Sequence, residues 1–475
     1  MTLNRLPIRP LASGLAAALL LSACTVGPSY VRPTVVTPPA FKEAPNGTSG
    51  WVPTQPMDTI DRGAWWSEFS DPVLDGLEGR VVISNQNVAQ AVASYAQARA
   101  LTSADRANFF LTATANASAN RNGGGGGASA NRFSASLGGS WAPDVWGRLR
   151  RQVQADVANA QASAADLANA TLSAQTELAV DYFNLRVLDE QKRLLDDTVT
   201  GYQRVVTITQ NQYNAGVAAK ADLITAQTQL ISAQASAADV AVQRAQDEHA
   251  IAVLAGMAPS ELTIALVPTL ERSVPTAPVV TPSVLLQRRP DIAAAERRVD
   301  AASAEIGVAT AAYFPSFNLT ADYGFNAASL GSLLSSSGNA WSIGLGAAET
   351  LLDFGARKAR VAQARANYDR AVAAYRQTVL NAFRGVEDQL VALRVLEQES
   401  TLRDQALASA RQAEQIALNR YRAGQGDFTT VVQAQNTALS SAQSVLSVLR
   451  SRRNASVGLI EALGGGWTTA DLPKR

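Results

Sequence analysis

The amino-acid sequence predicts a mainly α-helical chain that also contains a pair of β-hairpins and consists of two internal structural repeats. Three observations lead to this fold class. Very long helical patterns cover 148–213 and 357–421, and a pair of alternating segments precedes each of them. The motif Leu-Arg-Val-Leu at 185–188 recurs 208 positions later, at 393–396. A period this long indicates two equivalent halves rather than a solenoid.

The same spacing relates further positions and sets the domain boundaries. The turn Tyr-Asn-Ala-Gly at 213–216 falls on Tyr-Arg-Ala-Gly at 421–424, and Gly256 falls on Gly464. We therefore assign 81–270 to the first repeat, with a hairpin at 112–141 and a long helix at 148–213. The second repeat covers 271–475, with a hairpin at 316–348 and a long helix at 357–421.

The N-terminus predicts an export signal and a lipid anchor. Residues 1–23 combine two early arginines with a short Leu/Ala run, which is typical of a secretory signal peptide. The stretch Leu-Ser-Ala-Cys at 21–24 matches a bacterial lipobox, and Cys24 is the only cysteine of the chain. The alternative is an ordinary signal peptide followed by an incidental cysteine. Residues 24–80 then begin with a Pro-rich, extended tether, which continues to about residue 60.

The helical segments predict a sheath of uniform height. A helix of about 65 residues is roughly 100 Å long. Shorter helical stretches precede each hairpin, at 82–110 and 290–313, and return helices follow each long helix, at 218–256 and 427–463. Two short helices stacked end to end would match one long helix. The alternative is a coiled-coil spacer, but a spacer has no need of strands.

The hairpin segments alternate between apolar and small or polar residues over about ten positions. This period is typical of membrane β-strands with one face in lipid, although a hairpin packed on a soluble core is an alternative. Four strands cannot close a barrel, and lipid does not tolerate open edges. More than one chain must contribute, and the physical argument does not supply the number. The alternating apolar rows are Ala113, Ala115, Ala117 and Ala119; Phe133, Ala135, Leu137, Gly139 and Trp141; Phe317, Leu319, Ala321, Tyr323 and Phe325; and Trp341, Ile343, Leu345 and Ala347.

Composition excludes several classes of function. The chain has 41 Lys and Arg against 40 Asp and Glu, so no net charge attracts nucleic acid. One cysteine and one histidine exclude a disulfide framework and a thiolate–imidazole metal site. We expect no cofactor apart from the covalent lipid on Cys24, no metal and no catalytic residues. His249 has no nearby nucleophile in the sequence and is interpreted as a surface residue.

Three stretches resemble one known family. They are Trp-Trp-Ser-Glu-Phe-Ser-Asp-Pro at 65–72, the Arg-Arg-Pro-Asp-Ile motif that begins at Arg288, and the two Tyr-x-Ala-Gly turns. Together they resemble the TolC-type outer-membrane factor family, in its lipidated, NodT-like branch that serves tripartite RND efflux pumps. The family signature residues are Arg288, Arg289, Pro290, Asp291 and Glu296. We interpret them as structural, because Pro and Asp fit the first turn of a helix.

This resemblance implies a homotrimer in the cell outer membrane. The trimer would form a twelve-stranded transmembrane β-barrel above a long α-helical coiled-coil barrel in the periplasm, with an equatorial belt near 25–80, 258–289 and 464–475. The implied partners are a periplasmic adaptor, an inner-membrane RND-type pump and outer-membrane lipid, with no nucleic acid. The family has no catalytic step of its own.

The resemblance places the periplasmic tip and its gate at the two Tyr-x-Ala-Gly turns. Gly fits there for a structural reason alone, because helices commonly end in left-handed geometry. Capping or solvated charge is the alternative for the charged candidates. Related channels often have an acidic ring after the second turn, where this chain has Thr430 and Gln433. The tip and gate candidates are Tyr213, Gly216, Lys220, Asp222, Arg420, Tyr421, Arg422, Gly424, Asp427, Thr430 and Gln433.

We therefore expect a passive exit duct for small molecules that an inner-membrane pump expels. A duct for protein secretion or metal export is the first alternative. A lipidated periplasmic adaptor is the second, but an adaptor would have one helical hairpin and a separate all-β domain. Nothing in the sequence supports an enzyme.

Overall fold

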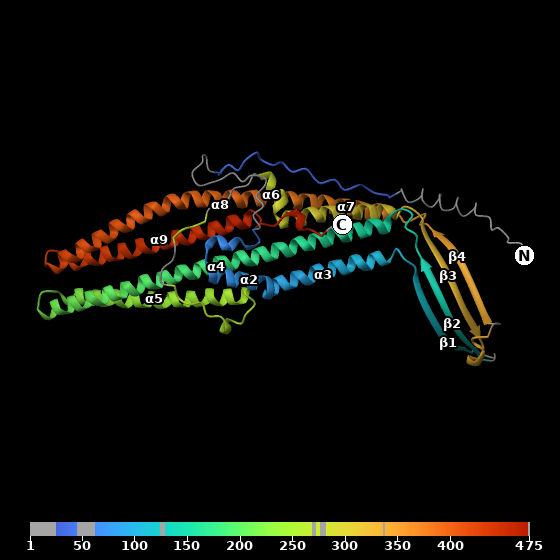
Figure 1. Ribbon diagram of the computed structural model, residues 1–475, viewed down its shortest axis with the longest axis horizontal. Coiled ribbons are helices and arrows are strands. Elements are labelled where there is room, and N and C mark those ends of the chain that lie inside the picture. The colour runs from blue at the N-terminus through green and yellow to red at the C-terminus, as the bar shows by residue number, and fades with distance from the viewer. Residues whose placement is uncertain are drawn as a thin grey trace, which may run out of the picture.

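The computed structural model describes residues 25–44, 62–123, 129–267, 272–275, 282–335 and 338–473. The helices form one elongated bundle, and the strands form a sheet at one of its ends (Figure 1). The predicted signal peptide at 1–23 and the predicted lipidation site, Cys24, lie outside the described residues.

The two halves of the chain contain elements of matching order. The first half has η1 (Arg62–Phe69), α2 (Pro72–Ser84), α3 (Gln86–Ala107), β1 (Thr112–Asn122), β2 (Ala130–Trp141), α4 (Arg148–Asn214) and α5 (Lys220–Leu254). The second has η2 (Pro259–Glu261), α6 (Pro282–Arg288), α7 (Pro290–Ala311), β3 (Ser316–Ala327), η3 (Leu330–Ser332), β4 (Asn339–Ala348), α8 (Ala356–Arg422), α9 (Phe428–Ala462) and η5 (Thr469–Asp471). Helices α4 and α8 both have 67 residues, and α5 and α9 both have 35.

The predicted helix at 82–110 was wrong in one respect. Asn85 separates α2 from α3, because its side-chain oxygen accepts hydrogen bonds from the N–H groups of Asn87 and Val88. This is an N-cap, so a new helix begins at residue 86.

The helices form four parallel columns. Helix α4 contacts α3, α5, α7 and α9, and α8 contacts α7 and α9. Near the sheet the order across the bundle is α3, α4, α7, α8; further away it is α5, α4, α9, α8 (Figure 1). Column α8 therefore forms one edge of the bundle, and the stacked pair α3 and α5 forms the other.

The sheet is antiparallel with the strand order β1-β2-β3-β4; two hairpins form it, and the helices from α4 to α7 lie between them in the chain. Its register aligns Leu137 with Tyr323, and Tyr323 with Trp341. Strand β1 follows α3 and strand β4 precedes α8, so the edges of the sheet continue the edges of the helical bundle. Neither edge strand has a second strand beside it within the described chain.

The core lies between columns and is built partly from small side chains. Helices α4 and α7 approach each other through Ala155, Ala158, Ala301 and Ala304. A larger cluster around Tyr182 and Phe183 joins α4 to α2 and α5. Among the described residues, no helix combines the length and the apolar content that a bilayer crossing requires.

Candidate functional site

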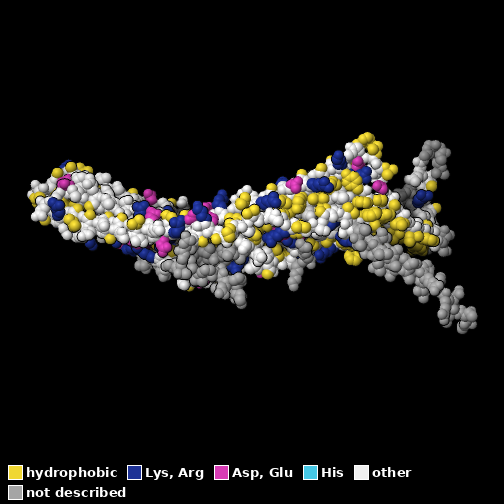
Figure 2. Space-filling view, turned by 90° about the horizontal axis from the view of Figure 1, so that it is seen from above, with side chains coloured by type: hydrophobic (Ala, Val, Ile, Leu, Met, Phe, Trp, Pro, Cys, Tyr) yellow, Lys and Arg dark blue, Asp and Glu magenta, His cyan; other side chains and the backbone are white. Residues whose placement is uncertain are grey.

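The sheet has one apolar and one polar face. Cross-strand register places Ala115, Leu137, Tyr323 and Trp341 in one row, and the rows on either side of it continue the same face. The Trp341 side chain is 75% exposed, although it is a large aromatic group. Figure 2 shows hydrophobic side chains gathering towards the sheet end of the molecule. A sheet of this kind separates an apolar environment from water.

The opposite face of the sheet is rich in Thr, Ser, Asn and Gly residues, and several of its polar side chains bond to one another. Ser118 and Ser134 hydroxyls are 2.7 Å apart, and the Ser140 hydroxyl donates to Asn318 Oδ1 at 3.1 Å. Gly138 lies directly against the Asp322 carboxylate, where a Cβ would collide with Oδ1. This face therefore presents mostly small polar side chains.

Helices α5 and α3 are joined end to end. Asn85 caps α3, as described above, and its Nδ2 donates to the last carbonyl of α5, on Leu254, at 2.8 Å. Gly256 has a φ of +70° and approaches the Ser84 carbonyl so closely that a Cβ would overlap it. The buried side-chain amide of Asn85 therefore bonds backbone groups at the end of α5 and at the start of α3.

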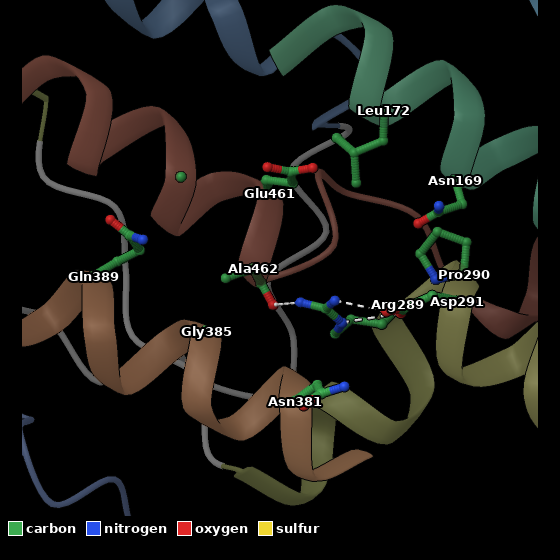
Figure 3. Close-up of a pocket in the computed structure, with 11 residues that line it drawn as sticks. Asn169, Leu172, Arg289, Pro290, Asp291, Asn381, Gly385, Gln389, Glu461 and Ala462 are labelled. Atoms are coloured by element: carbon green, nitrogen blue, oxygen red, sulfur yellow. Dashed lines mark hydrogen bonds and ion pairs between the residues drawn. The ribbon is translucent and has the colours of Figure 1, made fainter. Parts of the chain in front are cut away.

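Helices α9 and α7 are joined in the same place of the second half, by an arginine (Figure 3). Arg289 donates to the last carbonyl of α9, on Ala462, at 2.6 Å and forms a two-pronged ion pair with Asp291. Gly464 has a φ of +95°, and a Cβ there would overlap the Arg288 carbonyl. The signature residues Arg289, Pro290 and Asp291 thus act at a helix junction.

A cavity of about 210 Å³ lies beside this second junction. Glu461 lines it, and burial raises the pKa of that carboxyl. The Ser173 hydroxyl and the Arg289 guanidinium act in the opposite direction. The last signature residue, Glu296, lies elsewhere, paired with Arg297 and the Tyr30 hydroxyl.

The far end of the bundle contains the two Tyr-x-Ala-Gly turns. Gly216 and Gly424 have φ values of +72° and +70°. The amides that follow them, on Val217 and Gln425, donate back to the helix at 2.9 Å. Both turns are helix ends of the left-handed type, which satisfies the last carbonyls.

The structure separates the two tyrosines of these turns. Tyr421 is 7% exposed and packs on Phe428, with 5.4 Å between ring centroids, in a cluster that includes Val205 of α4. Its hydroxyl lies 3.4 Å from the Thr209 hydroxyl. Tyr213 is 39% exposed. Tyr421 therefore joins the two helical hairpins, whereas Tyr213 does not.

The two aspartates near the turns also differ. Asp427 is the N-cap of α9, and hydrogen bonds from the Thr430 amide and hydroxyl lower the pKa of its carboxyl. The N-cap of α5 is Ala219, which offers no side-chain bond, and Asp222 lies in the first turn. The remaining candidates, Lys220, Arg420, Arg422, Thr430 and Gln433, have exposed side chains. Within the described chain none of the three cations forms an ion pair.

Residues 25–44 form an extended strap along α7 and α8 (Figure 1). The strap begins beside the sheet, where the Val26 amide donates to the Trp146 carbonyl at 3.1 Å and Thr25 packs on Gly147. Arg151 holds the carbonyls of Val26 and Gly27. At its other end, Glu43 pairs with Arg394 of α8.

Sequence patterns had not indicated several buried polar groups. Glu78 of α2 is fully buried, and among the described residues neither of its carboxyl oxygens has a hydrogen-bond partner; burial raises its pKa to about 9. Sequence patterns had also not indicated the partly exposed Asp144 and Asp353, which accept backbone N–H bonds at the starts of α4 and α8. Their place a few residues before a long helix was the available signal.

The comparison with known proteins agrees with this geometry. The family model described as "Outer membrane efflux protein" matches residues 79–257 and 281–465. The pyoverdine export outer membrane protein OpmQ of Pseudomonas putida is 30% identical over 92% of this chain and 95% of its own length. The cation efflux system protein CusC of Escherichia coli is 27% identical over 95% and 97%.

Solved structures show the same fold. The outer-membrane channel OprN matches with a TM-score of 0.86 and 31% identity, over 94% of this chain and all of that one. The open state of the Neisseria gonorrhoeae MtrE outer membrane channel matches with a TM-score of 0.81 and 27% identity, over 93% and 98%. The resemblance noted in the sequence is confirmed, and the chain belongs to the outer membrane efflux protein family.

Proposed function

We propose that this protein is the outer-membrane exit duct of a tripartite efflux system, and that three copies close into a twelve-stranded barrel above a twelve-helix conduit. The observation that carries the proposal is the four-stranded sheet, which is apolar on one face and polar on the other, and whose two edges are unpaired in the part of the chain that the structure describes. In lipid every strand edge must be paired, so β4 of one copy must meet β1 of the next.

The helical edges support the same ring. Val217, in the turn before α5, and Ile224 and Ile231 of α5 are exposed at seven-residue spacing, and α8 exposes Leu402 and Ile416 at twice that spacing. Seven-residue spacing is that of a coiled-coil seam. Ile224 and Ile416 lie the same number of residues from the glycines of their turns, and so at the same height. Packing α8 of one copy on α5 of the next would bury both stripes.

The number of copies comes from the family resemblance. Each copy contributes four strands and four helical columns, so three copies give a barrel and a conduit of twelve elements each. Two internal repeats per chain would then make the ring nearly sixfold. Closure alone also permits other numbers, since membrane barrels begin at about eight strands.

The strap supports a lipid anchor on Cys24. Thr25, the next residue, packs on Gly147 at the junction of sheet and helices. An acylated Cys24 would therefore enter the leaflet beside this junction, and the helices would extend into the periplasm. Several acyl chains on one residue anchor stably where one does not.

The far tip would contact the periplasmic adaptor and close the duct at rest. Lys220, Arg420 and Arg422 are exposed there and available to carboxylates of a neighbouring copy or of the adaptor. The driving force would come from an inner-membrane RND-type pump, and the duct itself would need no cofactor. Named relatives serve pyoverdine export and cation efflux, so small solutes are the proposed cargo.

Electron microscopy of the protein purified from outer membranes tests the assembly. The expected particle has threefold symmetry, a short barrel and a helical tube. A water-soluble monomer would contradict the proposal. Deletion of the gene should raise susceptibility to small toxic compounds; loss of a secreted protein, or metal sensitivity alone, would favour the alternative cargoes.

A further inference from the structure

The junction between sheet and helices exposes large apolar side chains. Leu351 and Phe354, between β4 and α8, are 89% and 93% exposed, and Phe110, after α3, is 73% exposed. Phe354 also has a φ of +49°, which is rare for a residue with a side chain. Leu and Phe are among the residues that interfacial segments bury at the boundary between headgroups and acyl chains.

Cations follow directly after this apolar junction. Arg148 is the first residue of α4, and Lys358 and Arg360 lie in the first turns of α8. We call these three residues the basic collar. All three side chains are exposed, and none forms an ion pair within the described part of the chain. By contrast, Arg357 is engaged by Asp353 and lies over the Tyr313 ring.

The charge of α8 is segregated along its length. From Ala356 to Gly385, the part nearer the sheet, α8 contains seven Lys or Arg and one Asp. From 386 to 410 it contains two Arg and five Asp or Glu. The overall balance of charge hides this gradient. An excess of cations on the membrane side is what an anionic lipid surface attracts.

We propose that the basic collar binds the phosphate groups of anionic phospholipids, such as phosphatidylglycerol, in the leaflet that receives the N-terminal lipid. The inference rests on the proposed function, because it needs the sheet to lie in a bilayer. It is supported by the strap, since Thr25 packs on Gly147, immediately before Arg148. The anchor, the apolar junction and the collar then lie at one level.

The full lipidated protein, reconstituted in vesicles of phosphatidylethanolamine and phosphatidylglycerol, provides the test. After extraction in mild detergent, mass spectrometry measures the ratio of the two lipids that stay bound. The variant Arg148→Gln/Lys358→Gln/Arg360→Gln removes the collar. The matched control, Lys192→Gln/Arg193→Gln/Arg403→Gln, removes three cations in the distal half of the helices.

Wild type and control should retain phosphatidylglycerol above its bulk fraction, and the collar variant should retain it at the bulk fraction. Each cation near such a surface favours anionic lipid about fivefold. At low salt, the enrichment of bound phosphatidylglycerol over phosphatidylethanolamine should therefore fall on the order of tenfold or more in the collar variant. Retention at the bulk fraction by wild type, or enrichment that survives in the collar variant, overturns the inference. If the chain does not associate with these vesicles at all, the proposed function itself fails.

Discussion

Two helix junctions, which we call joints, connect helices end to end with different chemistry: the first joins α5 to α3, and the second joins α9 to α7. In the first joint, a buried neutral amide, Asn85, bonds both helix ends. In the second, the charged Arg289 bonds the α9 carbonyl and is held by Asp291. What is equal in both is the backbone, with a left-handed glycine where the chain leaves the helix. The geometry of the joint therefore depends on glycine, whereas the side chain that closes it differs between the two.

The largest expected effect comes from adding a Cβ at either joint. In Gly464→Ala or Gly256→Ala the new methyl group overlaps a backbone carbonyl, and the positive φ adds strain. We expect a loss of about 3 kcal/mol or more in unfolding free energy, because neither partner is a flexible side chain. Urea or thermal unfolding in detergent measures it.

Gly216→Ala is the matched control for that substitution. Gly216 also has a positive φ, but its Cβ would meet no atom within 4 Å. Its cost should be about 1 kcal/mol, the conformational part alone. Equal losses for Gly216→Ala and Gly464→Ala would show that the close contact at the joint does not matter.

The next effect separates the two turn tyrosines. Tyr421→Ala removes a buried ring that joins the helical hairpins, and should cost about 3 kcal/mol locally. Tyr213→Ala removes a partly exposed ring, and should change stability by about 0.5 kcal/mol or less. Hydrogen exchange of the tip amides measures both. Similar protection in the two variants would contradict the asymmetry.

Asn85→Ala tests the first joint through its side chain. It leaves two N–H groups of α3 and the Leu254 carbonyl without their partner, so we expect a loss of about 2 kcal/mol. Arg289→Lys keeps a charge at the second joint but loses the two-pronged pair, and should cost about 1 kcal/mol. Chemical unfolding measures both variants. A larger loss of unfolding free energy in Arg289→Lys than in Asn85→Ala would contradict this ranking.

Glu78 gives the first half a pH dependence through a fully buried carboxyl. Its folded pKa, about 9, lies above the unfolded value, so the folded chain keeps a proton that the unfolded chain releases. This contribution is complete below about pH 4.5 and is lost as pH rises towards 9, with a slope of at most about 1.4 kcal/mol per pH unit. Glu78→Gln should abolish the slope in unfolding experiments; an unchanged slope would assign it to other groups.

The sequence predicted the long helices within one residue at each end and the strands that form the sheet. Both rest on a periodicity that continues for many turns or alternations, so local pattern suffices. The joints could not be predicted, because Asn85 and Arg289 bond carbonyls that lie 169 and 173 residues away. The different burial of Tyr213 and Tyr421 likewise depends on the neighbouring hairpin. The two turns share the Tyr-x-Ala-Gly motif, but the motif alone does not determine what each tyrosine packs against.

The smallest expected effect is a change in hydrogen exchange at the tip, and it distinguishes Asp427 of the second half from Asp222 of the first. The Asp427 carboxylate accepts a hydrogen bond from the Thr430 amide, and this bond lowers the pKa of the carboxyl. The contribution of this bond to stability is therefore present above the unfolded pKa of Asp427, and it is lost as pH falls through the folded pKa. Asp427→Ala should therefore weaken hydrogen-exchange protection in the first turn of α9 at neutral pH, whereas Asp427→Asn, which retains an acceptor, should preserve most of it. Asp222→Ala should leave the first turn of α5 unchanged, because Ala219, and not Asp222, occupies the cap. Loss of protection in both helices would mean that the two aspartates act alike, and that the asymmetry of the tip is confined to its tyrosines.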